Sequence, residues 1–213
     1  MKLYWANRIT ILRIFMIIPF VSCMLKINDP ALSLGMRNAA RYASIAIFLL
    51  MAASDTLDGY LARTKKQVTK LGAFLDPIAD KLLITCACLL LVSQRAVVQT
   101  DERVFLLPST VVVFIIGKDL FLLIGFLVVY FLTSRVHIAP MLIGKIANAL
   151  QLSMVGSVLV APEVYSVFPG WIWFMRTLWW SAAAAAILAT IIYIRNGSRY
   201  IEQYEQGSVS REV

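Results

Sequence analysis

Six long hydrophobic stretches, separated by short polar segments, set the pattern of the chain and predict membrane-spanning helices. A span needs about 20 mainly apolar residues. The stretches cover residues 9–26, 38–63, 72–93, 104–133, 140–160 and 171–195. We therefore expect one domain over residues 1–213, an all-α, multi-pass integral membrane protein with six transmembrane helices.

The two ends of the chain are polar. Residues 1–8 combine aromatic and cationic side chains, including Trp5 and Arg8, which suits the headgroup level of a membrane. A signal peptide is the alternative, but Arg13 and Pro19 interrupt the apolar run that such a peptide requires. Residues 196–213 are expected to form a polar cytosolic tail that is partly ordered at best.

Composition agrees with a membrane protein and indicates its orientation. The chain is 60% hydrophobic and 15% charged, with a net charge of +8, a balance that is rare among soluble domains. Its cations lie mainly at helix ends and in short loops, which suits an anionic lipid surface better than nucleic acid. They are more numerous on the side that carries both termini, so we expect that side to face the cytosol. A bacterial inner or plasma membrane is the expected location.

Four aspartates stand between residues 54 and 81, in a chain that is otherwise mostly apolar: Asp55, Asp58, Asp76 and Asp80. Their spacings of three and four place each pair on one face of a helix. A basic segment, residues 64–70, separates the two pairs and predicts a cytosolic turn. Carboxylates at a membrane edge are costly and indicate function. A helix cap explains one of them, such as Asp76 before Pro77, but not four.

Such a cluster predicts a divalent metal centre. Carboxylates that gather in one site repel each other unless protons or a cation neutralise them. Ligands that are all oxygen suit a hard ion such as Mg²⁺ or Mn²⁺. Two ions bridged by shared carboxylates would form a clamp for displacement at phosphorus.

The aspartates belong to a longer pattern with fixed gaps: Asp55, Asp58-Gly59, Ala62-Arg63, Gly72, Asp76 and Asp80. This pattern resembles, position for position, the signature of the CDP-alcohol phosphatidyltransferase family. Within the family, the chain is most similar to bacterial phosphatidylglycerophosphate synthases and CMP-forming cardiolipin synthases. The segment from Ala6 to Arg13 also resembles the family's entry into its first helix. The alternative is that Thr10 and Arg13 only anchor a helix end at the membrane surface.

The resemblance implies transfer of a phosphatidyl group from CDP-diacylglycerol to an alcohol, with release of CMP, in a polar cavity open to the cytosol. It assigns two metal ions to Asp55, Asp58, Asp76 and Asp80, and makes Asp80 the general base. The resemblance assigns the nucleotide and its diphosphate to Gly59, Ala62, Arg63, Thr69 and Gly72.

Two lysines are candidates for binding the acceptor alcohol. Lys118 stands beside Asp119 in the middle of a hydrophobic stretch, too deep for easy snorkelling, where the family tends to carry a basic-acidic pair. A local pair that snorkels is the alternative; otherwise, Asp119 would orient Lys118 or Arg63. Lys145 lies in an element resembling the family's Gly-Lys motif, or it only marks the cytosolic edge.

The acceptor is expected to be glycerol 3-phosphate, with phosphatidylglycerol, as in a cardiolipin synthase, as the alternative. Glycerophosphate-type members often carry a second Lys and a Thr where this chain has Ala147 and Asn148. A rival of another class is a six-span transporter with an acidic cation site. The run from Ala182 to Ala186 suits close helix contact, either as internal packing or as the face of a homodimer.

Overall fold

The computed structural model is an all-α bundle with one small β-hairpin. It describes the backbone of residues 5–65, 70–93, 99–100, 103–133 and 142–209, and the side chains of residues 8–54, 78–93, 105–125 and 143–195. Within that part, the helices are α1 (Trp5–Leu25), α2 (Leu34–Lys65), α3 (Lys70–Val92), α4 (Ser109–Thr133), α5 (Leu142–Leu159), α6 (Ala161–Val167) and α7 (Trp171–Val209). The hairpin pairs β1 (Gln99–Thr100) with β2 (Arg103–Val104).

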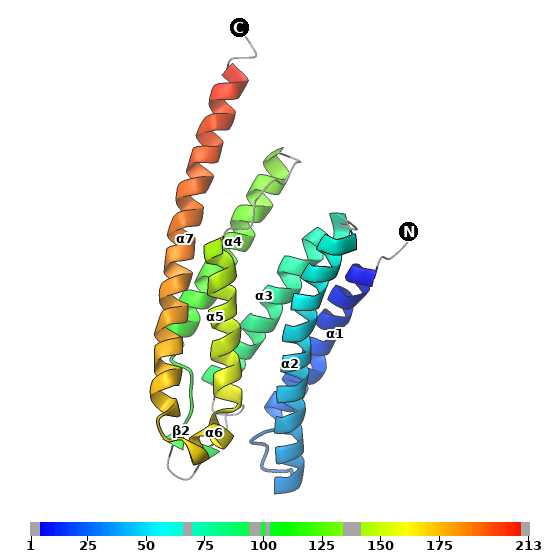
Figure 1. Ribbon diagram of the computed structural model, residues 1–213, viewed down its shortest axis with the longest axis vertical. Coiled ribbons are helices and arrows are strands. Elements are labelled where there is room, and N and C mark those ends of the chain that lie inside the picture. Colours follow the sequence, from blue (N-terminus) through cyan, green and yellow to red (C-terminus); the bar gives the residue numbers. More distant parts are fainter. Residues whose placement is uncertain (1–4, 66–69, 94–98, 101–102, 134–141, 210–213) are drawn as a thin grey trace.

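The long helices form two groups of three that meet along α3 (Figure 1). In the first group α1 packs against both α2 and α3, and in the second α7 packs against α4 and α5. Helix α3 joins the groups because it also contacts α4 and α5. Successive long helices run in opposite directions, and the N- and C-terminal ends lie at the same end of the bundle (Figure 1).

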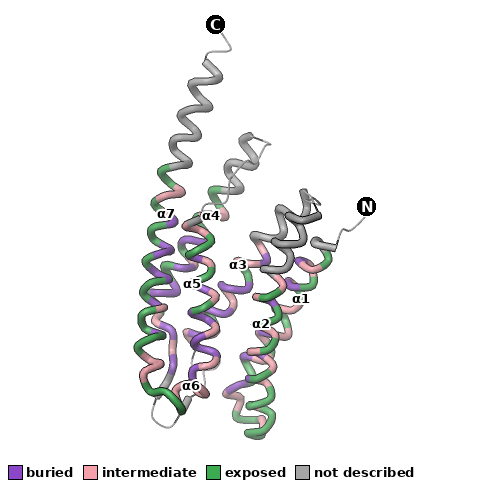
Figure 2. Tube along the Cα trace, viewed as in Figure 1, coloured by how far each residue is buried: buried purple, intermediate pink, exposed green. Residues whose placement is uncertain are grey.

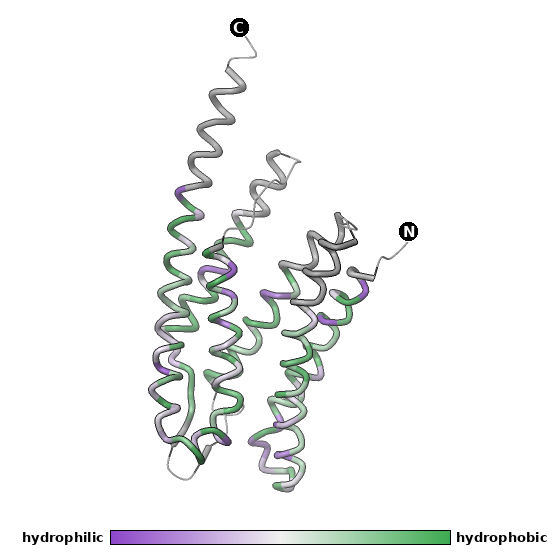
Figure 3. Tube along the Cα trace, viewed as in Figure 1, coloured by the Kyte–Doolittle hydropathy of each residue, from purple (hydrophilic) through white to green (hydrophobic). Residues whose placement is uncertain are grey.

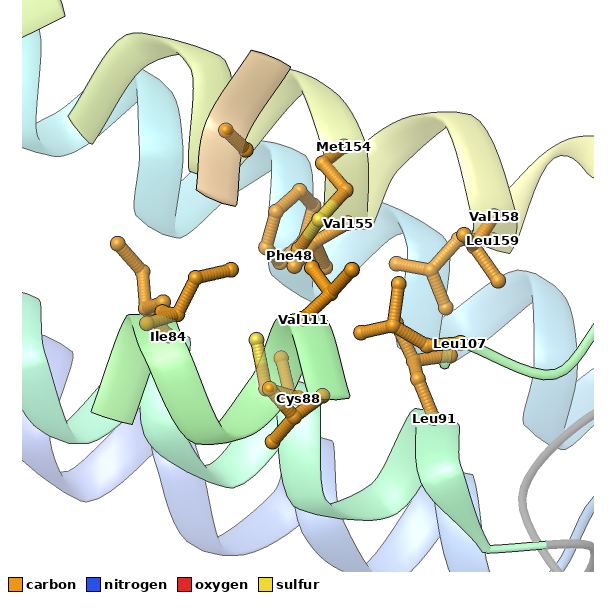
Figure 4. Packing of buried hydrophobic residues seen from close by; sticks show 14 of the residues in the cluster. Phe48, Ile84, Cys88, Leu91, Leu107, Val111, Met154, Val155, Val158 and Leu159 are labelled. Carbon is orange, nitrogen blue, oxygen red and sulfur yellow. The ribbon is translucent and has the colours of Figure 1, made fainter. Parts of the chain in front are cut away.

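One hydrophobic core crosses the junction between the two groups. It contains residues from all six long helices, among them Phe20, Phe48 and Met154, each at most 2% exposed. The rings of Phe20 and Phe48 lie 6.1 Å apart, and Figure 4 shows Phe48, Ile84 and Met154 converging on this core. The helix faces that point away from it are largely exposed (Figure 2) and rich in large apolar side chains.

The alanine run of α7 packs inside the protein. Ala182, Ala183, Ala185 and Ala186 are buried, and a second cluster joins Ala185 and Ala189 to Ala147 of α5. The approach is equally close at Gly144 of α5, where an added Cβ would lie 2.9 Å from the Tyr193 hydroxyl oxygen. Small side chains therefore let α5 and α7 approach closely, as expected for helices in a membrane.

The predicted helices differ from the structure at three places. The segment between the fifth and sixth hydrophobic stretches contains a short helix, α6, which begins at Ala161 because proline is tolerated in the first turn of a helix and Pro162 lies there. Helix α6 is also held to α2, because Arg41 of α2 forms an ion pair with Glu163 of α6.

Helix α4 begins at Ser109 and not at residue 104. The residues before it form an extended segment that ends at Pro108, and in this segment the Leu107 N–H donates to the Leu91 carbonyl at 3.2 Å.

The third difference is the length of α7, which continues to Val209, whereas the sixth hydrophobic stretch ends at residue 195. No proline occurs between residues 196 and 209, and Glu202, Gln203, Glu205 and Gln206 favour a helix. The helix therefore continues past Asn196 and Gly197, although these two residue types often end helices.

Apolar helices long enough to cross a membrane are present. Within the described residues, Arg8–Leu25 and Trp171–Arg195 qualify alone. Residues Ile143–Leu159 and Ala161–Val167, bent by 68°, add a third if they form one span. Figure 3 shows mostly hydrophobic helices, with short hydrophilic stretches interrupting α1 and α3. These features are those of a membrane protein.

Candidate active site

The aspartate motif lies on two consecutive helices. Asp55 and Asp58 belong to the last third of α2, and Asp76 and Asp80 to the first half of α3. The two helices come together at the end of the bundle that also carries the chain termini (Figure 1). Of the predicted metal ligands, only Asp80 is among the described side chains.

The predicted nucleotide site lies outside the described side chains. It consists of Gly59, Ala62 and Arg63 in α2, Gly72 in α3, and Thr69 between the two helices. The metal and nucleotide assignments therefore stay predictions, and the described geometry begins at Asp80.

Asp80 is hydrogen-bonded to a side chain from another helix. The amide nitrogen Nδ2 of Asn148, in α5, donates to Asp80 Oδ2 at 3.0 Å. The carbonyl oxygen Oδ1 of the same amide accepts from Lys81 Nζ at 2.8 Å and from Lys118 Nζ at 3.5 Å. One amide thus connects the predicted general base to two lysines.

A buried carboxylate holds the two lysines together. Lys81 Nζ of α3 and Lys118 Nζ of α4 each lie 2.9 Å from Asp119 Oδ1. The side chains of Lys118 and Asp119 are only 2% and 4% exposed, whereas that of Lys81 is 20% exposed. The Lys118–Asp119 contact expected from the sequence is present. Lys118 does not snorkel, because its charge is paired inside the bundle.

The five residues form a group of balanced charge where α3, α4 and α5 meet. Two carboxylates, Asp80 and Asp119, face two ammonium groups, Lys81 and Lys118, with Asn148 between them. Burying charges is costly unless they are paired and hydrogen-bonded. We call these five residues the polar cluster.

The first helix reaches the aspartate motif from the other side. Arg13 of α1 is 3% exposed, and its Nε donates to Ser54 Oγ at 3.4 Å. Ser54 directly precedes Asp55 in α2. Thr10, one turn earlier in α1, is also buried. Thr10 and Arg13 therefore lie inside the bundle and not on its surface.

Lys145 is exposed on α5 and lies three residues before Asn148, so the two share one side of the helix. The preceding Gly144 lets Tyr193 of α7 approach, as described above. The Gly-Lys element therefore combines close helix packing with a lysine that faces outward, near the polar cluster in sequence.

Sequence reasoning missed two members of the polar cluster. Lys81 directly follows Asp80, and Asn148 was noted only as a departure from the threonine that related proteins often carry. Both residues are polar and stand inside predicted spans, where each buried polar group requires a partner. This polarity was the feature of the sequence that could have identified them. Which partner each would find depends on how α3, α4 and α5 pack.

Comparison with known proteins identifies the family. Residues 3–192 match the family model of CDP-alcohol phosphatidyltransferase. The CDP-diacylglycerol–glycerol-3-phosphate 3-phosphatidyltransferase of Bacillus subtilis is 36% identical over 156 residues, 72% of each chain. The protein of the same name from Pseudomonas fluorescens is 43% identical over 89 residues, 42% of this chain and 41% of its own. That of Haemophilus influenzae is 46% identical over 54 residues, 25% of this chain and 29% of its own.

These matches confirm the resemblance seen in the sequence and decide against the transporter interpretation. The family match extends over nearly the whole chain, from residue 3 to residue 192, and so includes every helix that contributes to the polar cluster. The chain belongs to the CDP-alcohol phosphatidyltransferase family.

Proposed function

We propose that this protein transfers the phosphatidyl group of CDP-diacylglycerol to glycerol 3-phosphate, forming phosphatidylglycerophosphate and CMP. The observation that carries the proposal is the Bacillus subtilis relative, whose name states this reaction and which aligns over 72% of each chain. The polar cluster adds support, because it sets two lysines beside Asp80, where an anionic acceptor has to bring its hydroxyl.

We propose that six helices span the membrane, with the active site in a polar cavity on the cytosolic side. The alternating directions of the six long helices, with both termini at one end, support this arrangement (Figure 1). That end carries the turn between α2 and α3, whose lysines suit the cytosolic side of a bacterial inner membrane. A cytosolic site would meet a water-soluble acceptor and release CMP into the cytosol.

The metal centre is proposed on Asp55, Asp58, Asp76 and Asp80. Their donor set fits Mg²⁺ or Mn²⁺, since it is made of carboxylate oxygens from adjoining ends of two consecutive helices. When bound, two such ions would neutralise negative charge on the diphosphate as CMP leaves. Arg63 would pair with a phosphate, and Gly59 and Gly72 would let the nucleotide approach the backbone. Ala62 and Thr69 complete this proposed donor site.

Asp80 is the proposed general base. Its carboxylate would take the proton from the free hydroxyl of glycerol 3-phosphate as that oxygen attacks the phosphatidyl phosphorus. The new phosphorus–oxygen bond forms as the bond to the CMP oxygen breaks, and the electron pair leaves with CMP. Lys118 and Lys145 are the proposed contacts for the acceptor's phosphate, and Lys81 brings a further cation beside Asp80.

A panel of acceptors tests this function. Purified protein in detergent would be given CDP-diacylglycerol, Mg²⁺ and one acceptor at a time, and CMP release would be measured. We expect release with glycerol 3-phosphate and none with serine or inositol phosphate, with Asp80→Asn as the inactive control. Release only with phosphatidylglycerol would replace the proposal with cardiolipin synthesis, and no release with any acceptor would end it.

A further inference from the structure

We propose that Asn148 is a positioning residue that fixes the orientation of the Asp80 carboxylate toward the acceptor hydroxyl. The inference rests on the proposed function, in which Asp80 is the general base. It deepens that function by assigning a role to a residue that departs from related sequences. The starting point is the hydrogen bond from Asn148 Nδ2 to Asp80 Oδ2 at 3.0 Å.

The charges around Asn148 permit one orientation of its amide. An ammonium group can only donate hydrogen bonds, and an ionised carboxylate can only accept them. Lys81 Nζ and Lys118 Nζ lie 2.8 and 3.5 Å from Asn148 Oδ1. A flipped amide would set its NH₂ group against two cations and its oxygen against a carboxylate. The lysines therefore turn the donor end of the amide toward Asp80.

Packing next to Asn148 along α5 also holds its amide in place. Ala147 is fully buried and packs against Ala185 and Ala189 of α7, which fixes α5 at the residue before Asn148. Asp119, 4% exposed, fixes the two lysines that hold the amide oxygen. The packing at Ala147 and the hydrogen bonds at the amide oxygen therefore leave the NH₂ group of Asn148 directed at Asp80 Oδ2.

Such an arrangement suits proton transfer, because a base works only when it reaches the proton in a productive geometry. Misplacing a reacting group by about 1 Å can cost on the order of 100-fold in rate. A hydrogen bond that fixes one carboxylate oxygen of Asp80 limits rotation of the whole group. Losing that bond should slow the chemical step while leaving the binding of both substrates nearly unchanged.

A pair of variants with matched shapes tests the idea. Threonine and valine are both β-branched and nearly equal in shape, but threonine carries a hydroxyl that can donate to Asp80 where valine carries a methyl group. Steady-state kinetics would be measured with CDP-diacylglycerol and glycerol 3-phosphate. We expect kcat of Asn148→Val to fall about 30- to 100-fold, with both KM values within about threefold of wild type. We expect Asn148→Thr to retain at least about tenfold more kcat than Asn148→Val.

One control and one alternative pair of variants keep the result decisive. Ser153→Ala, on the exposed side of α5, should keep wild-type kcat. If Asn148→Val does not fold, the Asn148→Ser and Asn148→Ala pair provides the same comparison.

The inference fails if Asn148→Val keeps kcat within about threefold of wild type, or if the Thr and Val variants are equally slow. It fails also if the Val variant raises KM and leaves kcat unchanged. Failure of the proposed function looks different, because wild-type protein would then release no CMP with glycerol 3-phosphate. If another acceptor supports release, the same variants are compared with that acceptor. If none does, both proposals are overturned.

Discussion

Replacing Asp119 with asparagine would remove the charge that holds two lysines together inside the bundle. Asp119 Oδ1 lies 2.9 Å from both Lys81 Nζ and Lys118 Nζ. At an effective dielectric constant of about 20, one such contact has a Coulomb energy of about 6 kcal/mol before desolvation. Removing one partner of a buried ion pair costs about 3–5 kcal/mol net. Because an asparagine oxygen can still accept a hydrogen bond, we expect about 3 kcal/mol.

For a chain of this length, about 1 kcal/mol corresponds to roughly 2–4 °C in Tm. The Asp119→Asn variant should therefore melt about 6–12 °C below wild type. Melting in detergent can be followed with a thiol-reactive dye, because Cys88 is fully buried in the core and becomes reactive when the bundle opens. The matched control is Asp29→Asn, in the loop before α2, where Asp29 Oδ1 accepts a local bond from the Ala31 N–H.

A second variant separates electrostatics from packing. Adding Lys118→Met to Asp119→Asn removes the buried ammonium group that has lost its carboxylate partner, and should recover at least half of the lost Tm. The reasoning is refuted if Asp119→Asn melts within about 2 °C of wild type and of Asp29→Asn. It is refuted also if the double variant is no more stable than the single one.

The other predictions concern the proposed metal site and the packing of α5 against α7. Asp80→Asn should abolish CMP release but keep the Kd for CDP-diacylglycerol within about threefold of the wild-type value. Asp58→Ala should weaken the binding of Mg²⁺ and of the donor together. Near-normal turnover in both variants would contradict the assigned roles. A chelator should abolish CMP release, and added Mg²⁺ or Mn²⁺ should restore it; activity that persists in chelator argues against the metal centre. Gly144→Ala in a Tyr193→Phe background should raise stability by up to about 1 kcal/mol, because alanine favours a helix over glycine and the hydroxyl oxygen that would lie 2.9 Å from the new methyl is gone. With Tyr193 present, the gain in Tm should be smaller, and equal gains in the two backgrounds would show that the contact between α5 and α7 does not limit this position.

The hydrophobic pattern predicted each long helix because membrane helices need long apolar stretches whatever their neighbours. It missed α6, where the meaning of Pro162 depends on its place in the first turn of a helix. It also missed the continuation of α7 to Val209, because hydropathy reports where apolar residues end. The helical backbone of α7 continues beyond that point.

The aspartate motif could be predicted because its spacing is local to two helices. The polar cluster could not, because Asn148 lies 68 residues from Asp80 and 30 from Lys118 along the chain. Spacing relates residues on one helix, but nothing in it specifies which helices will be neighbours. The contact of Lys118 with Asp119 was predictable for the same reason that the motif was, since the two residues are adjacent.

The burial of Ala147 restricts how this protein could change its acceptor preference. By its resemblance to glycerophosphate-type members of the family, this position would often hold a lysine, yet here Ala147 is buried and packs with Ala185 and Ala189 of α7. A lysine introduced alone would have to force the two helices apart. The alanines on α7 would need to change first, so the order in which substitutions arise, and not only their identity, decides which descendants of this sequence can fold.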